Sequence, residues 1–274
     1  MGVEAFYAAA THTLFTLVGL CVGSFLNVAA YRLPLGLRLS KPSSHCPQCK
    51  RRLAWRDLIP LLSYIFLGGK CRYCGKRIPF RYFFVELING MLWLACSLTL
   101  YESNGIAAAL IFALTLSTLL CMAICDAEHM MIPDSLQVSL LLFALAGAFL
   151  APTPAWTQRL YGAMLGGGFF LFFYFLSPVL FGREGLGLAD VKLMAIAGIF
   201  LGAASTALAI VIGTVSALAG VCMREAARAG QRRLPLFDGD KEFAFAPGLI
   251  LGIVTAAVYG EQIWSAYRSM FAGF

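Results

Sequence analysis

Long runs of apolar residues, separated by short polar segments, make up most of the chain and predict its secondary structure. Runs of roughly 17 to 25 apolar residues are long enough to cross a bilayer as helices. The pattern therefore predicts an all-α polytopic membrane protein. The runs lie at about 10–31, 83–101, 106–125, 136–152, 159–181, 193–223 and 244–260.

The composition supports this class. Of the 274 residues, 60% are hydrophobic and 13% are charged, whereas soluble domains carry about 25% charged residues. The first residues, "MGVEAFYAAATHTLF", lack the positive charge and the cleavage site of a signal peptide. We therefore expect the first run to be a retained membrane span.

The distribution of charge predicts the topology. Residues 32–82 contain twelve basic residues and a single acid, Asp57. Under the positive-inside rule this loop is cytoplasmic, and the N-terminus lies outside. Orientation in the membrane thereby explains the net charge of +7, and no nucleic-acid partner is expected.

Following the chain onward gives about eight transmembrane helices. The basic segment 224–233 should also be cytoplasmic, which requires the run at 193–223 to form two short helices that turn near 202–205. The C-terminus then lies outside, like the N-terminus. The expected domains are a first transmembrane helix at 1–31, a cytoplasmic zinc-binding loop domain at 32–82 and a transmembrane core at 83–274.

Four of the nine cysteines are spaced as two C-x2-C pairs, with 21 residues between the pairs. Four thiolates presented by two tight turns complete the tetrahedral shell of a structural zinc ion. The loop has few apolar residues for a core, so a metal would supply folding energy. A redox dithiol and four idle thiols are the alternatives. The predicted ligands are Cys46, Cys49, Cys71 and Cys74.

Two aspartates are expected at the same depth in the membrane. In the deduced topology Asp126 ends the third span and Asp190 begins the sixth, both on the cytoplasmic side. Ionisable residues at such positions are costly and suggest function. Two neighbouring carboxylates that share one proton can activate water and hydrolyse a peptide bond. A helix cap or an ordinary interfacial residue is the alternative for each.

Four motifs in order resemble those of the type IV prepilin peptidases, which are aspartyl proteases of the bacterial inner membrane. "GLCVGSFLNVAAYRLP" resembles the first-span signature of this family, and the four-cysteine loop resembles its zinc loop. "DAEHMMIPD" and "GLGLADVKL" resemble the two segments that carry its active-site aspartates, and "FAFAPGL" is a weaker match. These motifs begin at residues 19, 46, 126, 185 and 243.

The resemblance implies that Asp126 and Asp190 form the catalytic dyad of an aspartyl peptidase core at 83–274. Family members cleave the basic leader from type IV prepilins or type II secretion pseudopilins, just after a glycine and at the cytoplasmic face. Members with the four-cysteine loop also N-methylate the new N-terminus with S-adenosylmethionine. The implied cofactors are structural zinc and S-adenosylmethionine, and the implied partners are prepilin substrates and the bilayer.

Three residues around Asp190 are candidates for positioning the substrate. The family usually has Gly-x-Gly-Asp, and Ala189 stands in place of the second glycine, so the turn must accept an ordinary backbone conformation. Gly187 would let a peptide backbone approach closely. Lys192 is a candidate for holding the peptide or a lipid phosphate, and the alternative is a lysine that extends to the headgroups.

The sequence does not locate the methyl-donor site. Gly23, Ser24, Asn27 and Glu86 are candidates for a structural or a methyltransferase role. Two other functions fit the pattern of spans and charges. One is a zinc-stapled transporter whose aspartates relay protons, and the other is a non-catalytic secretion scaffold whose aspartates cap helices.

Overall fold

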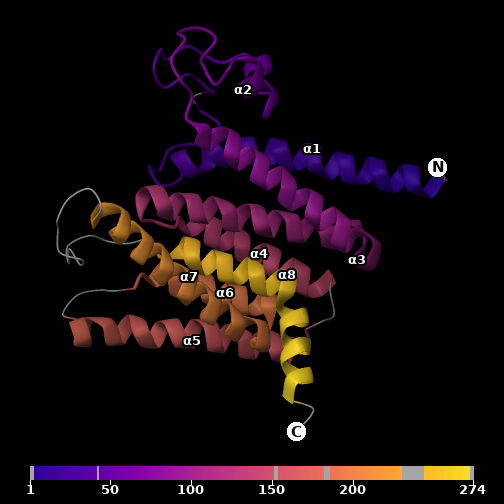
Figure 1. The fold of residues 1–274 in the computed structure, drawn as a ribbon, viewed down its shortest axis with the longest axis vertical. Coiled ribbons are helices and arrows are strands. Elements are labelled where there is room, and N and C mark those ends of the chain that lie inside the picture. The colour runs from indigo at the N-terminus through magenta and orange to yellow at the C-terminus, as the bar shows by residue number, and fades with distance from the viewer. Residues whose placement is uncertain (1–2, 42, 151–153, 182–185, 230–243, 272–274) are drawn as a thin grey trace. The chain divides into compact units, whose positions relative to one another are not determined.

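The computed structural model describes every residue except 1–2, 42, 151–153, 182–185, 230–243 and 272–274. Most of the described residues are helical, and two isolated β-bridges lie in the cysteine loop (Figure 1). The elements are α1 (Val3–Arg32), the 3-10 helix η1 (Trp55–Asp57), α2 (Leu62–Phe66), α3 (Phe80–His129), α4 (Asp134–Leu150), α5 (Trp156–Phe181), α6 (Leu188–Leu201), α7 (Ala203–Ala229) and α8 (Ala246–Phe271).

The expected all-α membrane protein is confirmed. Within the described chain, six helical segments are long and apolar enough to span a membrane, and α4 is a shorter apolar helix of 17 residues. Two of the six belong to α3, which is broken at Gly105, where φ is +80°. The polar residues between the predicted runs at 83–101 and 106–125 therefore form a break within one helical segment. The six are Val3–Arg32, Phe80–Tyr101, Ser103–His129, Trp156–Val179, Ala203–Met223 and Ala246–Met270.

The run at 193–223 forms parts of two helices, as expected. α6 ends at Leu201, Gly202 adopts a left-handed φ of +76°, and α7 begins at Ala203. A side chain would be strained at that φ, so glycine suits the turn. The 14 residues of α6 rise about 21 Å, less than the roughly 30 Å hydrocarbon core of a bilayer. α6 is therefore shorter than a typical membrane span.

A buried arginine donates a hydrogen bond to a carbonyl near the C-terminal end of α6. Arg159, in the first turn of α5, donates from Nε to the Pro154 carbonyl at 2.9 Å and from Nη1 to the Ile199 carbonyl at 3.0 Å. The last carbonyls of a helix have no partner within the helix, and its dipole favours a cation there. Arg159 thus ties the start of α5 to the end of α6.

The segment Met1–Cys121 forms one compact unit, in which α1 packs closely on α3. The close approach depends on glycine. A Cβ at Gly19 would lie 2.6 Å from Trp93 Cβ, and a Cβ at Gly23 would lie 2.9 Å from Glu86 Cα. Asn89 Nδ2 also donates to the Gly19 carbonyl at 2.7 Å. Small residues and buried hydrogen bonds are the means by which helices associate in lipid.

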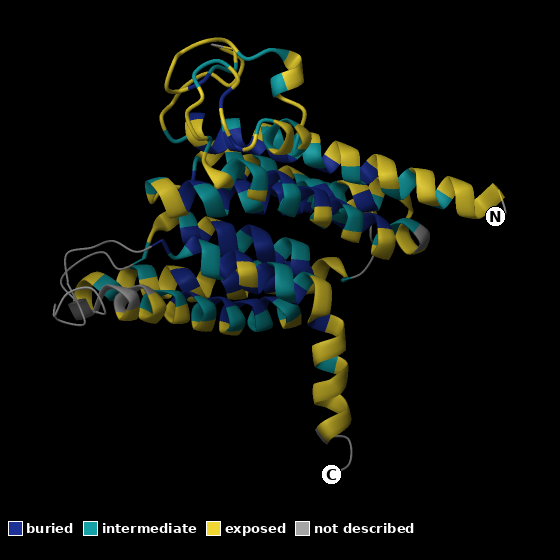
Figure 2. Ribbon diagram, turned by 45° about the horizontal axis from the view of Figure 1, so that its top comes forward, coloured by how far each residue is buried: buried dark blue, intermediate teal, exposed yellow. Residues whose placement is uncertain are grey.

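The segment Met122–Phe274 forms the second compact unit, and α6 is its central helix. α6 contacts α4, α5, α7 and α8, and eight of its 14 residues are buried. By contrast, the C-terminal part of α8 is largely exposed (Figure 2). Gly198 of α6 packs directly on the backbone of Gly162 in α5. The neighbours of α6 therefore fix the position of Asp190 in its first turn.

Candidate active site

The two candidate aspartates lie at helix ends within the second unit. Asp126 is in the last turn of α3, and Asp190 is in the first turn of α6. Their exposed fractions are 9% and 8%. The Asp126 carboxylate is close enough to repel a charge on Asp190. The fold thus brings together two acids that lie far apart in the sequence.

The start of α8 supplies a hydrogen bond to Asp126. The backbone N–H of Ala246 donates to Asp126 Oδ2 at 2.9 Å, and this bond is buried. N–H groups in the first turn of a helix lack intrahelical partners and favour a negative charge. Pro247 suits this first turn because its missing N–H costs nothing there. The "FAFAPGL" segment therefore contributes to the site, although Phe243 lies outside the described residues.

Gly187 shapes the backbone before Asp190. It is the N-cap of α6, with φ −80° and ψ 143°, and the Asp190 N–H donates to its carbonyl at 3.1 Å. A Cβ at Gly187 would lie 3.4 Å from Asp190 Oδ2, so the carboxylate lies against the start of the helix. Ala189 lies within α6 and has no left-handed φ, which fits the ordinary conformation expected for it. Gly185, the first residue of the motif, lies outside the described residues.

The first turn of α4 contacts the segment around Asp190 in two places. Lys192 Nζ forms an exposed ion pair with Asp134 Oδ1 at 2.7 Å, so Asp134 engages its ammonium group. Gln137 Nε2 donates to the Ala189 carbonyl at 2.8 Å, and Gln137 is 4% exposed. Sequence reasoning missed Gln137. The available signal was a lone polar amide in an apolar run, which suggests function.

The four cysteines lie on two turns of the same construction. In each turn, the residue after the second cysteine donates its N–H to the carbonyl of the first, from Lys50 to Cys46 and from Gly75 to Cys71, at 2.9 Å in both cases. Lys50 and Gly75 both have a left-handed φ, +59° and +69°. A short antiparallel bridge closes each turn. Each C-x2-C pair is thereby held in a tight turn with both thiols available.

The four thiols are close enough to share one metal ion. Their sulfur atoms lie within 4.8 Å of one another, and the Sγ atoms of Cys46 and Cys74 are 4.0 Å apart. A tetrahedral site with typical zinc–sulfur bonds places its sulfur atoms roughly 3.8 Å apart. The donor set and its spacing therefore fit zinc.

The pKa values of the Cys46 and Cys74 thiols differ, and each has a physical cause in its turn. Burial raises the pKa of the Cys46 thiol, but N–H donation from Cys49 and Gln48 outweighs it and lowers that pKa to about 7. The N–H of Lys76 lowers the pKa of Cys74, but burial and the hydrogen bonds among the thiols raise it to about 11. Cys46 is therefore the thiol that ionises more readily of the two.

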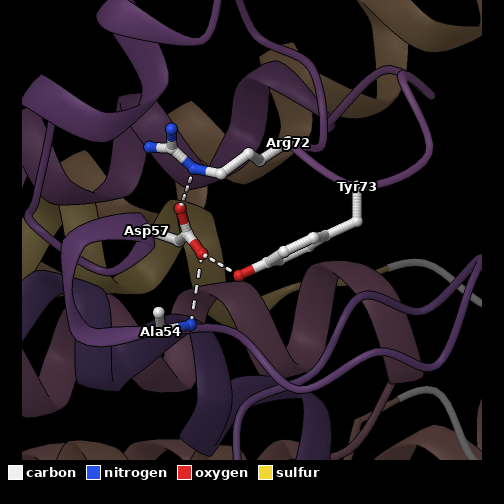
Figure 3. Close-up of polar contacts among 4 residues, drawn as sticks. All are labelled: Ala54, Asp57, Arg72 and Tyr73. Atoms are coloured by element: carbon white, nitrogen blue, oxygen red, sulfur yellow. Dashed lines mark hydrogen bonds and ion pairs between the residues drawn. The ribbon is translucent and has the colours of Figure 1, made fainter.

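Asp57, the one acid of residues 32–82, fastens two parts of the cysteine loop together (Figure 3). Its carboxylate accepts hydrogen bonds from Arg72 Nε at 2.6 Å, from the Tyr73 hydroxyl at 3.0 Å and from the Ala54 N–H at 3.1 Å. The Asp57 side chain is 3% exposed. Burial raises the pKa of Asp57, but the hydrogen bonds and the charge of Arg72 hold it below its usual range. The ionised carboxylate thus joins η1 to the second cysteine turn.

Two parts of the chain match known families. Residues 17–100 match the bacterial Peptidase A24 N-terminal domain, and residues 113–222 match the type IV leader peptidase family. The chain belongs to the type IV leader peptidase family.

Relatives in this family resemble the chain over much of its length. The prepilin leader peptidase/N-methyltransferase of Bacillus subtilis (strain 168) is 34% identical over 265 residues, which cover 95% of this chain and 99% of the relative. The protein of that name from Myxococcus xanthus (strain DK1622) is 41% identical over 189 residues, covering 69% and 55%. The type 4 prepilin-like proteins leader peptide-processing enzyme of Escherichia coli O78:H11 is 31% identical over 279 residues, covering 94% and 97%. No solved structure matches the chain.

Membership in the leader peptidase family confirms the resemblance carried by the sequence motifs. It also confirms the expected enzyme class, a peptidase with methyltransferase activity. The apolar helices make this leader peptidase a multi-pass membrane protein.

The four residues considered for a structural or a methyltransferase role join α1 to α3 in the leader peptidase, and Glu86 also joins α3 to the loop. Glu86 accepts a hydrogen bond from the Leu61 N–H at 2.8 Å, just before α2, and a second from Ser24. Asn27 Nδ2 donates to the Tyr82 carbonyl at 3.2 Å. Together with the packing of Gly23 on α3, these contacts give each residue a structural role.

A pocket of about 420 Å³ lies between the end of α1 and the cysteine loop. Its size suits a small ligand, and its polar lining consists of Arg32, Arg52 and the three serines Ser40, Ser43 and Ser44. S-adenosylmethionine carries a positive sulfonium group, which the two arginines would repel, and a carboxylate, which an arginine can bind. The lining of this pocket therefore does not by itself assign it to the methyl donor.

Proposed function

We propose that this protein removes the basic leader of type IV prepilins or type II secretion pseudopilins by means of Asp126 and Asp190. The observation that supports the dyad is that two buried carboxylates, from α3 and α6, interact electrostatically within the region that matches the leader peptidase family. Two carboxylates in such contact cannot both ionise easily, so one keeps a proton while the other is charged. That proton belongs to the pair.

The dyad would hydrolyse the peptide bond without a covalent intermediate. The charged carboxylate takes a proton from a water molecule, whose oxygen bonds to the scissile carbonyl carbon. At the same time the protonated carboxyl gives its proton to the carbonyl oxygen. The resulting diol collapses when the C–N bond breaks. The leaving nitrogen takes the proton that came from water, and one diol hydroxyl returns its proton to the carboxylate that had given one, which restores the dyad. The Ala246 N–H supports negative charge on Asp126 during these steps.

The charge pattern supports a site at the cytoplasmic face of the bacterial inner membrane, with both termini periplasmic. A prepilin has a basic leader inside the cell, followed by an apolar helix in the membrane. Its cleavage site therefore lies at the face deduced for both aspartates. Gly187 and Ala189, which lie beside Asp190 in the chain, are the proposed positions for contact with the peptide backbone.

We also propose that Cys46, Cys49, Cys71 and Cys74 bind a structural zinc ion. Four thiolates leave no open coordination position, so the metal would hold the loop rather than take part in chemistry. The proposed second activity is N-methylation of the new N-terminus, for which S-adenosylmethionine would supply the methyl group. The name shared by the relatives, prepilin leader peptidase/N-methyltransferase, supports it.

Leader cleavage by the purified protein tests the dyad. Wild-type protein, Asp126→Asn and Asp190→Asn are reconstituted in lipid with a prepilin, and the shortened product is followed by electrophoresis. Asparagine keeps the shape of the carboxylate but cannot serve as the acid or the base. Cleavage should therefore fall roughly a thousandfold in each variant.

Asp134→Asn is the matched control, because Asp134 is an exposed aspartate next to the site and has no role in the proposed chemistry. It should cleave at the wild-type rate. Methylation of a pre-cleaved pilin checks that the inactive variants are folded. Undiminished cleavage by either dyad variant would remove that aspartate from the mechanism.

The terminal positions of the aspartates argue against a proton-relaying transporter. A relay across the bilayer needs ionisable groups along the interior of the spans, whereas Asp126 and Asp190 lie in terminal turns. A non-catalytic scaffold predicts instead that both asparagine variants behave like the wild type.

A further inference from the structure

A buried glutamine of α4 donates a hydrogen bond to the backbone next to Asp190. Gln137 is 4% exposed, and its Nε2 donates to the carbonyl of Ala189, the residue before Asp190, at 2.8 Å. The other buried residues of α4 are all apolar, namely Leu140, Ala144 and Ala148. Gln137 is therefore the polar member of the buried face of α4, and it lies where this helix meets the start of α6.

The orientation of this amide is fixed by its partner. A carbonyl can only accept a hydrogen bond, so the NH₂ group of Gln137 must face Ala189 and the amide oxygen must face away. That oxygen, Oε1, is buried and has no hydrogen-bond partner among the described residues. A buried acceptor without a partner is unfavourable. A leucine or methionine would avoid this cost, so the contribution of the amide has to be sought in function rather than in stability.

The hydrogen bond to Ala189 acts on Asp190 through one residue of helical backbone. Ala189 and Asp190 are consecutive residues in the first turn of α6. Because the helical backbone between them is rigid, the position of the Ala189 carbonyl determines the direction in which the Asp190 side chain points. The exposed pair of Asp134 and Lys192 spans the same two helices on the outside. Exposed ion pairs of this kind contribute little. Within the packing of α4 on α6, the buried amide is therefore a direct hydrogen bond to the backbone at the start of α6.

We propose that Gln137 is a positioning residue for Asp190, which rests on the proposed function of the dyad. By holding the Ala189 carbonyl, Gln137 fixes the first turn of α6 and so the direction of the Asp190 carboxylate toward Asp126. It touches neither substrate nor the reacting atoms. It acts by keeping the two carboxylates at the separation that lets them share one proton.

Two substitutions separate positioning from mere packing. Gln137→Leu removes the donor and the orphaned acceptor at similar size, so it should leave the melting temperature unchanged or higher. Its kcat for prepilin cleavage should fall at least tenfold, with KM within twofold of the wild-type value. Asp134→Asn, which breaks the exposed ion pair, is the matched control and should keep the wild-type kcat.

Gln137→Glu gives a readout that packing alone would not produce. When protonated, the introduced carboxyl can donate to the Ala189 carbonyl, and activity should approach that of the wild type at low pH. When ionised, it can only accept and cannot bond to the Ala189 carbonyl, and the charged residues near this contact in the chain are Asp190 and Lys192 of α6 and Asp134 of its own helix. The ratio of the variant's kcat to the wild-type kcat should therefore fall as pH rises.

The measurement uses the full protein in lipid vesicles, a purified prepilin and a pH series, with methylation of pre-cleaved pilin as the folding check. A wild-type kcat in Gln137→Leu would overturn the positioning role while leaving the dyad intact. A pH-independent deficit of equal size in both variants, accompanied by a lower melting temperature, would show a structural role instead. Cleavage that survives in Asp126→Asn or Asp190→Asn would refute the dyad, and the positioning role with it.

Discussion

Replacing Asp57 with alanine should loosen the cysteine loop and weaken its hold on zinc. The carboxylate joins η1 to the second cysteine turn through Arg72, Tyr73 and the Ala54 N–H. Alanine removes the carboxylate, so these three donors lose the group that accepts their hydrogen bonds. Because the metal site and the fold of the loop form together, free energy lost from the fold is lost from zinc binding.

The size of the effect follows from the exposure of each partner. Hydrogen bonds to a charged group contribute about 1.5–3 kcal/mol when buried, and the Asp57 side chain is 3% exposed. The Arg72 side chain is 39% exposed, so its share is reduced to about 1 kcal/mol or less by solvent. The total loss should be about 3 kcal/mol, which corresponds to roughly a hundredfold weaker zinc affinity.

Competition with a chromophoric chelator measures this affinity in the full protein, purified in detergent micelles. The matched control is Arg56→Ala, an exposed neighbour of Asp57 in η1, which should bind zinc like the wild type. Asp57→Asn keeps one carbonyl acceptor and should fall between the two. Wild-type affinity in Asp57→Ala, or an equal loss in Arg56→Ala, would refute the role given to this carboxylate.

Two other measurements test the metal site and the helix packing. Burial raises the pKa of Cys46, but N–H donation lowers it to about 7, so the thiol protonates as pH falls through 7. The same competition assay should therefore show zinc affinity dropping from pH 8 to pH 6. A constant affinity would contradict this. A Cβ at Gly198 would collide with the backbone of Gly162, so Gly198→Ala should destabilise the protein by about 1–3 kcal/mol and lower its melting temperature. Gly168→Ala, where nothing lies within 4 Å, should melt like the wild type, and equal melting temperatures for the two variants would refute the close packing of α5 on α6.

Most helices could be predicted because the signal for each is local. A membrane span appears in the sequence as a continuous apolar run. The positive-inside rule required one more crossing and so predicted a turn near 202–205, and the structure places it at Gly202. The ends of helices were less well predicted. α8 continues to Phe271, beyond the apolar run that ends near residue 260, because a helix does not stop where its hydrophobicity declines.

The candidate site divides in the same way. The cysteine cluster and the neighbouring pair of aspartates could be expected in advance, because each residue belongs to a short motif whose chemistry is carried by residue type and spacing. Gln137 and the Ala246 N–H could not, because each acts on a residue that is distant in the sequence. A backbone N–H has no residue type to recognise, and the amide of Gln137 gains a role only where α4 meets α6.

By itself, the sequence determined the class of protein, its apolar helices and the spacing of the four cysteines, and it predicted the two candidate acids. These features depend on length, hydrophobicity and neighbouring residues, which a linear chain records directly. The tertiary structure decided which helix is central, which glycines allow close contact, and which groups donate hydrogen bonds to Asp126 and to the backbone beside Asp190. Those features depend on pairs of surfaces from separate helices, and their complementarity exists only once the helices have packed.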